Sequence, residues 1–210
     1  MFSIDPAALF IAFTVLIISL TVHEAAHAWS ADLLGDPTAA SLGRVSLNPA
    51  VHVDVIGTIV FPLLAMVSGI PIIGWAKPVP VSPEHLGPHW RRKFMVIAAA
   101  GPASNLVLAG LAAVLIHIGF TATGSSLDQT TTRLLFTALS LNVLLAVFNM
   151  LPVPPLDGGN VLAGLLPPSG AEVFDRLRPY GFLILYALLL TGVFGRVVYP
   201  IADKITGWLY

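Results

Sequence analysis

Apolar residues are gathered into five long stretches, which are separated by short polar connections. The stretches cover residues 7–29, 55–75, 94–120, 134–151 and 180–200. A helix needs about 20 mostly apolar residues to cross the hydrocarbon core of a bilayer, and every stretch except the second reaches that length within a few residues. The second stretch is interrupted by four helix-breaking residues, Gly57, Pro62, Gly69 and Pro71. These breaks favour a re-entrant loop or a hairpin over a single crossing.

Segments that cross hydrocarbon must hydrogen-bond their own backbone, which leaves helices as the natural choice for these stretches. We therefore expect an all-α integral membrane protein. Its architecture would be a polytopic helical bundle with a re-entrant or hairpin segment between the first and second full spans. The connections are too short to hold a soluble domain of ordinary size, so residues 1–210 are expected to form a single transmembrane domain.

The composition supports a membrane protein and excludes several kinds of site. Hydrophobic residues make up 56% of the chain and charged residues only 10%, whereas soluble domains carry about 25% charged residues. The net charge of -1 gives no indication of a nucleic-acid partner. The absence of cysteine rules out disulfides, thiolate metal ligands and a cysteine nucleophile. No basic region precedes the first apolar stretch, which we expect to be retained as a span.

Basic residues predict the orientation of the helices. Arg91, Arg92 and Lys93 come just before the third stretch, and Arg176 and Arg178 follow the fourth. Because lysine and arginine concentrate on the cytoplasmic side, the third stretch should run outward and the fourth inward. We expect a multi-pass protein of the cell (inner) membrane.

The first stretch ends in "HEAAH", residues 23–27. On a helix, His23 and His27 lie one turn apart on the same face and can bind one zinc ion. Glu24 is rotated by about 100° from His23, from where it can act as general base on a water at the metal. The alternative is a chance spacing of two histidines. Ionisable residues at membrane depth are costly unless they pair or bind something, which favours the metal site.

A catalytic zinc usually has three protein ligands, and Asp157 is the best third candidate. It follows the fourth stretch in "FNMLPVPPLDGGNVL", where three prolines break the helix and two glycines let backbone approach closely. An ordinary Asp-Gly-Gly surface turn is the alternative. Asp157 reaches the depth of His23 and His27 only if the first and fourth stretches run parallel. The chain must then return to the same membrane face between residues 32 and 91.

Three motifs together give a specific resemblance: "HEAAH" at 23–27, "GPASN" at 101–105 and "NMLPVPPLDGG" at 149–159. The sequence resembles the site-2 protease family of intramembrane zinc metalloproteases. It is most similar to the compact branch of that family, which lacks PDZ and CBS domains. The motifs lie in order, and the matching regions cover most of the chain from about residue 15 to 162.

The resemblance implies roles for five residues. His23, His27 and Asp157 would bind one zinc ion per chain, and Glu24 would be the general base. Asn149 is implied to help bind substrate or the oxyanion, although an asparagine bonded to broken helix ends is a structural alternative. The roles of His52, Asp54 and Asn105 stay open: the first two could shape a loop, and Asn105 could tie two helices together.

The function implied by the resemblance is endopeptidase cleavage within or next to transmembrane segments of membrane-bound regulatory proteins. The active site would lie towards the cytoplasmic side, with the lipid bilayer and a transmembrane protein or peptide substrate as partners. Two alternatives are a zinc transporter and a catalytically inactive homologue that binds membrane proteins. Transport predicts ligands leading to both membrane faces, and the intact Glu24 argues against an inactive protein.

Overall fold

The protein is almost entirely helical in its computed structural model, which describes residues 5–69, 74–123 and 128–210. No residue in these ranges belongs to a β-strand. The helices are α1 (Pro6–Leu33), α2 (Thr38–Ser41), η1 (Pro49–Val51), η2 (Val55–Val60), α3 (Phe61–Ser68), α4 (Pro83–Leu86), α5 (Trp90–Thr123), α6 (Gln129–Asn149), α7 (Asp157–Leu165), α8 (Pro168–Leu177), η3 (Arg178–Tyr180), α9 (Gly181–Leu190) and α10 (Val193–Leu209). The expected all-α bundle is confirmed.

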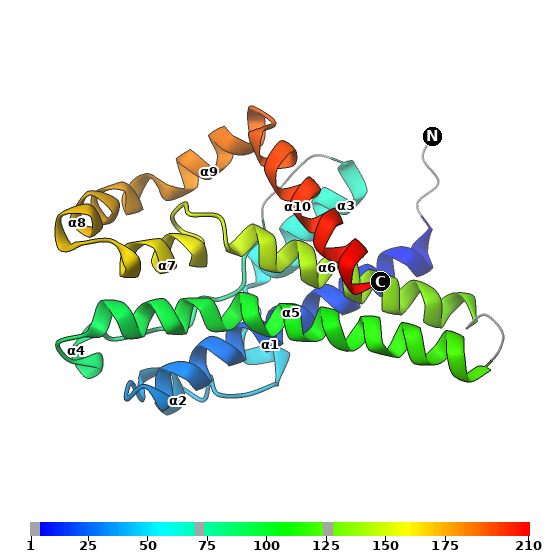
Figure 1. The fold of residues 1–210 in the computed structure, drawn as a ribbon, viewed down its shortest axis with the longest axis horizontal. Coiled ribbons are helices and arrows are strands. Elements are labelled where there is room, and N and C mark those ends of the chain that lie inside the picture. The colour runs from blue at the N-terminus through cyan, green and yellow to red at the C-terminus, as the bar shows by residue number, and fades with distance from the viewer. Residues whose placement is uncertain (1–4, 70–73, 124–127) are drawn as a thin grey trace.

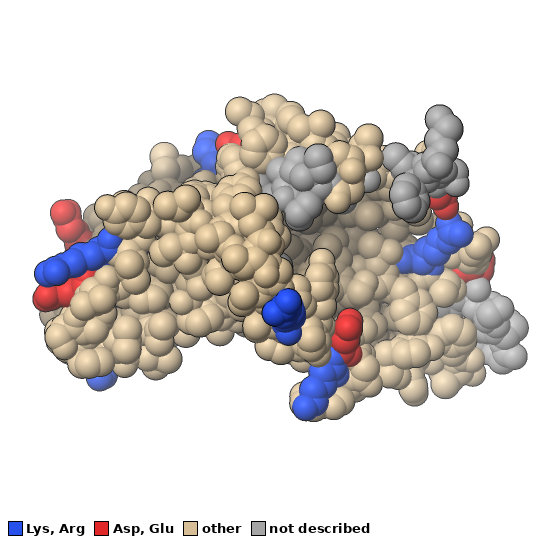
Figure 2. Space-filling model, turned by 90° about the horizontal axis from the view of Figure 1, so that it is seen from above, with Lys and Arg blue, Asp and Glu red and all other residues tan. Residues whose placement is uncertain are grey.

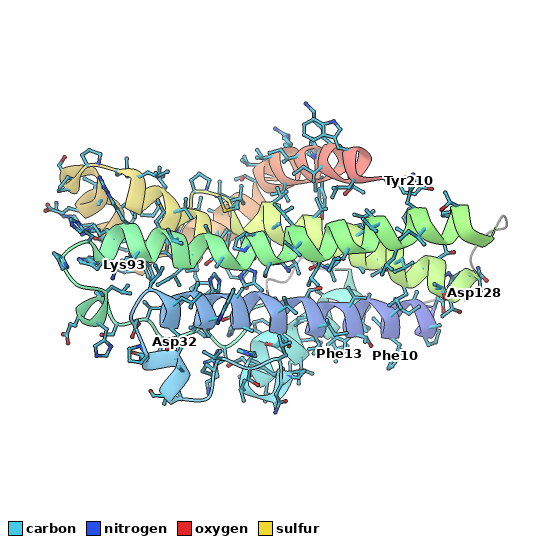
Figure 3. All side chains as sticks on the ribbon, turned by 60° about the horizontal axis from the view of Figure 1, so that its bottom comes forward. Phe10, Phe13, Asp32, Lys93, Asp128 and Tyr210 are labelled. Carbon is cyan, nitrogen blue, oxygen red and sulfur yellow. The ribbon has the colours of Figure 1, made fainter. Side chains whose placement is uncertain are left out.

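Helices α1, α5 and α6 form the centre of the bundle and are each long and apolar enough to cross a membrane. They lie against one another, with α5 antiparallel to the other two (Figure 1). In Figure 3, Asp32 and Lys93 mark one end of the bundle and Asp128 the other. Helices α1 and α6 therefore run in the same direction, as the shared depth of the candidate ligands requires.

The main core lies where α5, α6 and α10 meet. Small residues of α5, among them Ala109 and Ala112, pack against Leu139 and Val143 of α6, all of them fully or almost fully buried. Small side chains let helix backbones approach closely, which matters in lipid because no hydrophobic driving force brings the helices together.

The second apolar stretch forms a hairpin. It runs out through the π-helical turn η2 and α3, and it returns through a non-helical segment, residues 74–82, which we call the return segment. The Trp75 N–H donates to the Gly57 carbonyl at 3.0 Å, and the Lys77 N–H donates to the His52 carbonyl at 2.9 Å. These bonds bring the end of the hairpin back to its start, as predicted. Residues 70–73 of this stretch lie outside the described residues.

A buried arginine holds the return segment in place. The Arg44 guanidinium donates to the carbonyls of Lys77 at 2.6 Å and Pro78 at 3.2 Å. Asp54, left open by the sequence, caps η2: its carboxylate accepts from the backbone N–H of Gly57 at 2.7 Å. His52 is fully buried and bonds to the Ser46 carbonyl at 2.8 Å. All three side chains thus shape the hairpin.

The fifth apolar stretch lies in a bent pair of helices, which together are long and apolar enough to form one broken span. It forms α9 and α10, which meet at Gly192 in the left-handed region at φ 70°. The helices on the two sides of this break are inclined by 81° to each other. Glycine adopts this backbone conformation without steric cost, which allows the sharp turn. Helix α10 consequently crosses α6 obliquely (Figure 1).

The two basic clusters lie at the same end of the bundle. Arg91, at the start of α5, donates to Asp175 of α8 at 2.9 Å, and Asp175 also accepts from Arg178 at 2.9 Å. Figure 2 shows charged side chains at both ends of the long axis and a few more near its middle, at the upper and lower edges of the view.

Candidate metal centre

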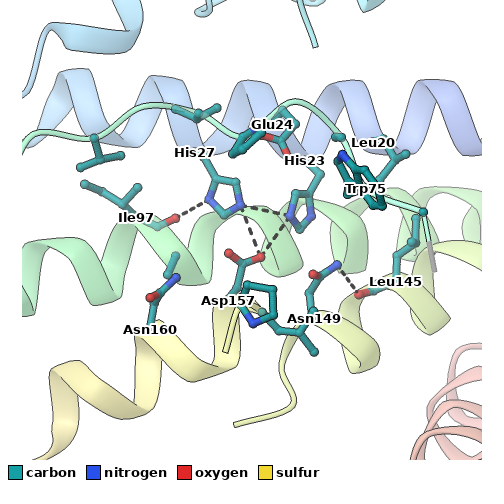
Figure 4. Close-up of a pocket in the computed structure, with 18 of the residues that line it drawn as sticks. Leu20, His23, Glu24, His27, Trp75, Ile97, Leu145, Asn149, Asp157 and Asn160 are labelled. Carbon is teal, nitrogen blue, oxygen red and sulfur yellow. Dashed lines mark hydrogen bonds and ion pairs between the residues drawn. The ribbon is translucent and has the colours of Figure 1, made fainter. Parts of the chain in front are cut away.

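Two buried histidines of α1 form one side of the site. His23 is 4% exposed and His27 is 8% exposed. Their Nε2 atoms are 3.0 Å apart, as the spacing of four residues on a helix predicts. Both rings point from α1 towards the start of α7 (Figure 4).

Asp157 supplies the other side. It is the first residue of α7, after a break of seven residues that follows α6. Its Oδ2 lies 3.1 Å from Nε2 of His23 and 3.4 Å from Nε2 of His27. A Cβ on Gly158 would overlap the backbone of Met150 and Leu151, so glycine is needed for α7 to turn back this tightly. The three residues named by the sequence are thus brought together from positions far apart in the chain.

The donor set fits a tetrahedral cation. With metal–ligand bonds of about 2.0–2.1 Å, a tetrahedral zinc ion separates its ligand atoms by roughly 3.3 Å. The three separations here are 3.0, 3.1 and 3.4 Å. The Ile97 carbonyl, which only accepts, lies 2.7 Å from Nδ1 of His27, so Nδ1 carries the proton and Nε2 presents a lone pair. Lone pairs gathered this closely in a buried place repel one another unless a cation lies between them.

A cavity of about 400 Å³ opens beside the three residues. Glu24 lines it from α1, and its carboxylate has no hydrogen-bond partner within the described part of the chain. Asn149 lines it from the end of α6 and donates one amide N–H to the Leu145 carbonyl at 3.0 Å. An amide nitrogen has two N–H donors, so one is left for another acceptor. The cavity therefore joins a carboxylate, an amide and the metal-binding group.

Gly101, in the "GPASN" motif of α5, determines how closely the histidines approach α5. A Cβ at this position would lie 2.6 Å from Cε1 of His23 and 2.5 Å from Cε1 of His27. Four residues further on, Oδ1 of Asn105 lies 2.6 Å from Nδ1 of His23. The motif thus provides both the space for the rings and a partner for one of them.

Sequence reasoning missed one contact of His27 and one residue that supports His23 through Asn105. The Ile97 carbonyl gives no signal in the sequence, because any residue supplies a backbone oxygen. Asn142 of α6 is 2% exposed and bonds to Asn105, whose amide nitrogen is 2.9 Å away. An asparagine within an apolar helix was the available signal for Asn142.

Asp36 lies away from the metal centre, in the connection after α1. It is fully buried. Burial by itself raises the pKa of Asp36, but hydrogen bonds from the Thr38 and His85 side chains and from the backbone N–H groups of Ser82 and Thr38 lower this pKa overall. Asp36 therefore joins the end of α1 to the return segment and α4 and has a structural role.

Comparisons with a family model and with known proteins agree on one protein family. The model of the family described as "Peptidase family M50" matches residues 115–192, a range that includes Asp157. Over 196 residues the chain is 37% identical to "Putative zinc metalloprotease YwhC" of Bacillus subtilis, covering 90% of this chain and 84% of that protein. It is 31% identical over 182 residues to a protein of Mycolicibacterium smegmatis with the same description and the name Rip2, covering 86% of this chain and 66% of that protein. No solved structure matches.

Proposed function

This chain belongs to peptidase family M50, and on that premise we propose that it is an intramembrane zinc endopeptidase. Its family identifies it as a zinc metalloprotease, and its three long apolar helices make it a multi-pass membrane protein. We propose further that it hydrolyses peptide bonds within or next to the transmembrane segments of membrane-bound regulatory proteins.

The observation that carries this proposal is the meeting of three ligand-type atoms beside a catalytic-type carboxylate. Side-chain atoms of His23, His27 and Asp157 lie within 3.0–3.4 Å of one another, and Glu24 lines the adjoining cavity. Two of the three residues belong to α1, which is long and apolar enough to span a membrane. A hydrolytic site in such a helix can reach peptide bonds that a soluble protease cannot.

His23, His27 and Asp157 would hold the zinc ion. When bound, zinc supplies a Lewis acid that polarises the scissile carbonyl and makes water a better nucleophile at neutral pH. Glu24 would take the proton from the attacking water and pass it to the leaving amine. Asn149 would donate its remaining amide N–H to the substrate or to the developing oxyanion.

The substrate must be extended at the bond to be cut, because helical amides shield their carbonyls. The return segment supplies a suitable wall: it is non-helical and contributes Ala76, Val79 and Val81 to the cavity. We propose that an unwound substrate segment lies along this wall. Strand-like pairing of the two backbones would then hold it against the metal centre.

The active site would lie towards the cytoplasm of the cell membrane. His27 is six residues from the end of α1, at the end of the bundle where Arg91 and Asp175 pair. The positive-inside rule assigns that end to the cytoplasm. Water for hydrolysis would enter from this side.

Zinc transport, the main alternative, predicts groups of ligands spread towards both faces. Within the described residues, one group of three or more ligand-type side chains is close enough to hold a metal ion, and it consists of His23, His27 and Asp157. This convergence at one place favours a catalyst over a permeation path.

The test uses purified protein in liposomes and two synthetic single-span peptides. One peptide carries an Asn-Pro-Gly break in its cytoplasmic half, and its control has an unbroken helix of the same length. We expect the wild type to cut the broken peptide within or next to the span, with cleavage positions read by mass spectrometry. Glu24→Gln should keep its zinc and lose cleavage. Cleavage by Glu24→Gln at the wild-type rate would contradict the proposed role of this carboxylate.

A further inference from the structure

Two buried asparagines lie behind the metal centre and do not line its cavity. Asn105 of α5 is 0% exposed, and Asn142 of α6 is 2% exposed. The Asn142 amide nitrogen donates to the Ala138 carbonyl at 2.8 Å, and the Asn105 amide nitrogen donates to Oδ1 of Asn142 at 2.9 Å. Oδ1 of Asn105 then lies 2.6 Å from Nδ1 of His23. A continuous chain of hydrogen bonds thus runs from the α6 backbone to a candidate metal ligand.

The direction of every bond in this chain follows from its starting point. The Ala138 carbonyl can only accept, so Asn142 must present its nitrogen there and its oxygen to Asn105. Asn105 must in turn present its oxygen to His23 and its nitrogen to Asn142, and that nitrogen also has a longer bond, at 3.4 Å, to the Ser19 carbonyl of α1. Nδ1 of His23 therefore has to donate, which leaves Nε2 without a proton. Only that form of the ring can bind a metal through Nε2.

His23 needs this chain, whereas His27 does not. The Nδ1 partner of His27 is the Ile97 carbonyl, which is an acceptor in any conformation. The partner of His23 is an amide whose oxygen and nitrogen exchange places when the side chain turns over. A turned Asn105 would present N–H groups to Nδ1 of His23, and the proton of the neutral ring would move to Nε2.

We propose that Asn142 is a positioning residue for metal binding, which acts through Asn105 to hold His23 in the tautomer with a free Nε2. The metal-binding part of this inference rests on the proposed function, whereas the tautomer of His23 can be measured in metal-free protein. Mutating a residue that hydrogen-bonds to a metal ligand typically lowers metal affinity by about ten- to a hundredfold.

The decisive variant is Asn142→Leu, which has a similar size and removes the 2.9 Å bond that orients Asn105, leaving the Asn105 nitrogen only its longer 3.4 Å bond to the Ser19 carbonyl. We expect its zinc dissociation constant to rise at least about tenfold in competition with a chelating dye. In metal-free protein labelled with ¹⁵N-histidine, the His23 signals should move from the Nδ1–H form towards the Nε2–H form. His23→Gln assigns those signals. Ser140→Ala, an exposed substitution on the same helix, is the matched control and should change neither measurement.

Asn105→Asp separates orientation from packing. Both carboxylate oxygens accept, so an aspartate at position 105 serves His23 whichever way it is turned. We expect the double variant Asn105→Asp/Asn142→Leu to bind zinc within a few-fold of Asn105→Asp alone. If Asn142 mattered only for packing, Asn142→Leu would weaken binding by the same factor in both backgrounds.

Asn142→Asp serves if Asn142→Leu does not fold. A protonated aspartic acid donates to the Ala138 carbonyl and still accepts from Asn105, so zinc affinity and the His23 tautomer should both stay near wild type. Wild-type zinc affinity in folded Asn142→Leu, an unrescued double variant, or an Nε2–H form of His23 in the metal-free wild type would each overturn the inference. A wild type that binds no zinc but shows the Nδ1–H form would overturn the proposed function and the metal-binding part of this inference, while the control of the His23 tautomer by Asn142 would stand.

Discussion

Gly101→Ala tests the geometry of the metal centre most directly. The added Cβ would lie 2.5 Å from Cε1 of His27 and 2.6 Å from Cε1 of His23. Ordinary carbon–carbon contacts are about 3.5–4.0 Å, so the rings or α5 must move by roughly 1 Å. Helix α5 cannot withdraw easily, because its Ile97 carbonyl and Asn105 side chain are bonded to the same two rings at 2.7 and 2.6 Å.

A displacement of that size is large compared with the tolerance of a zinc site, where bond lengths stay within about 0.2 Å of their usual values. We expect zinc content to fall from about one ion per chain to a small fraction. Overpacking costs about 1–3 kcal/mol, and replacing glycine by alanine within a helix returns about 0.8–1.0 kcal/mol. The apo variant should therefore stay folded.

The matched control is Gly110→Ala on the same helix, where an added Cβ meets no atom within 4 Å. It gains the same helix propensity and should keep its zinc. The assay is zinc per chain by mass spectrometry on detergent-purified protein, with helicity measured by circular dichroism. Full zinc occupancy in Gly101→Ala, or equal loss in both variants, would refute the placement of the rings against α5.

Three further predictions follow from the same geometry. Asp157→Ala should lose most of its zinc while keeping its helicity, and unchanged zinc content would mean that another residue is the third ligand. Gly164→Ala should weaken zinc binding indirectly. The added Cβ would lie 2.5 Å from Cβ of Met95 and would push α7, which carries Asp157, away from α5. Zinc binding at wild-type affinity would contradict this coupling between the α5–α7 contact and the metal centre. Asp36→Asn should make stability against thermal unfolding depend less on pH in the acid range. Despite burial, hydrogen bonds lower the folded pKa of Asp36 below its unfolded value of about 3.9. Its stabilisation is therefore present above about pH 4 and disappears as the pH falls through the folded pKa. Thermal unfolding in detergent at a series of pH values measures this, and an unchanged curve in Asp36→Asn would show that the buried carboxylate contributes nothing.

The sequence predicted those parts of the structure that depend on local composition. Length and hydropathy identified α1, α5 and α6, because a bilayer requires about 20 apolar residues in a helix. The breaks at Gly57 and Pro62 indicated a re-entrant loop or a hairpin, since these residues disrupt a regular span. The fifth stretch was different: its composition suits a span, but Gly192 allows a turn that only the packing of α10 against α6 selects.

The candidate ligands were also readable in advance, because motif spacing and chemistry restrict them. His23 and His27 share a helix face by periodicity alone. Asp157 was reached from its position after a helix end broken by three prolines and beside two glycines, and it shares the depth of the histidines because α1 and α6 are parallel. Asn149 lines the cavity in the structure, and its role in catalysis is a proposal.

What the sequence by itself determined was the membrane setting, the helical class, and the identity of the residues with metal-binding chemistry. Only the tertiary structure decided how those residues are held: the fit of Gly101 against both imidazoles, the Ile97 carbonyl on His27, and the path from Asn142 to His23. The physical reason is that periodicity reports which side chains share a face of one helix. Hydrogen-bond direction and steric fit between helices depend on the relative placement of elements that are distant in the chain.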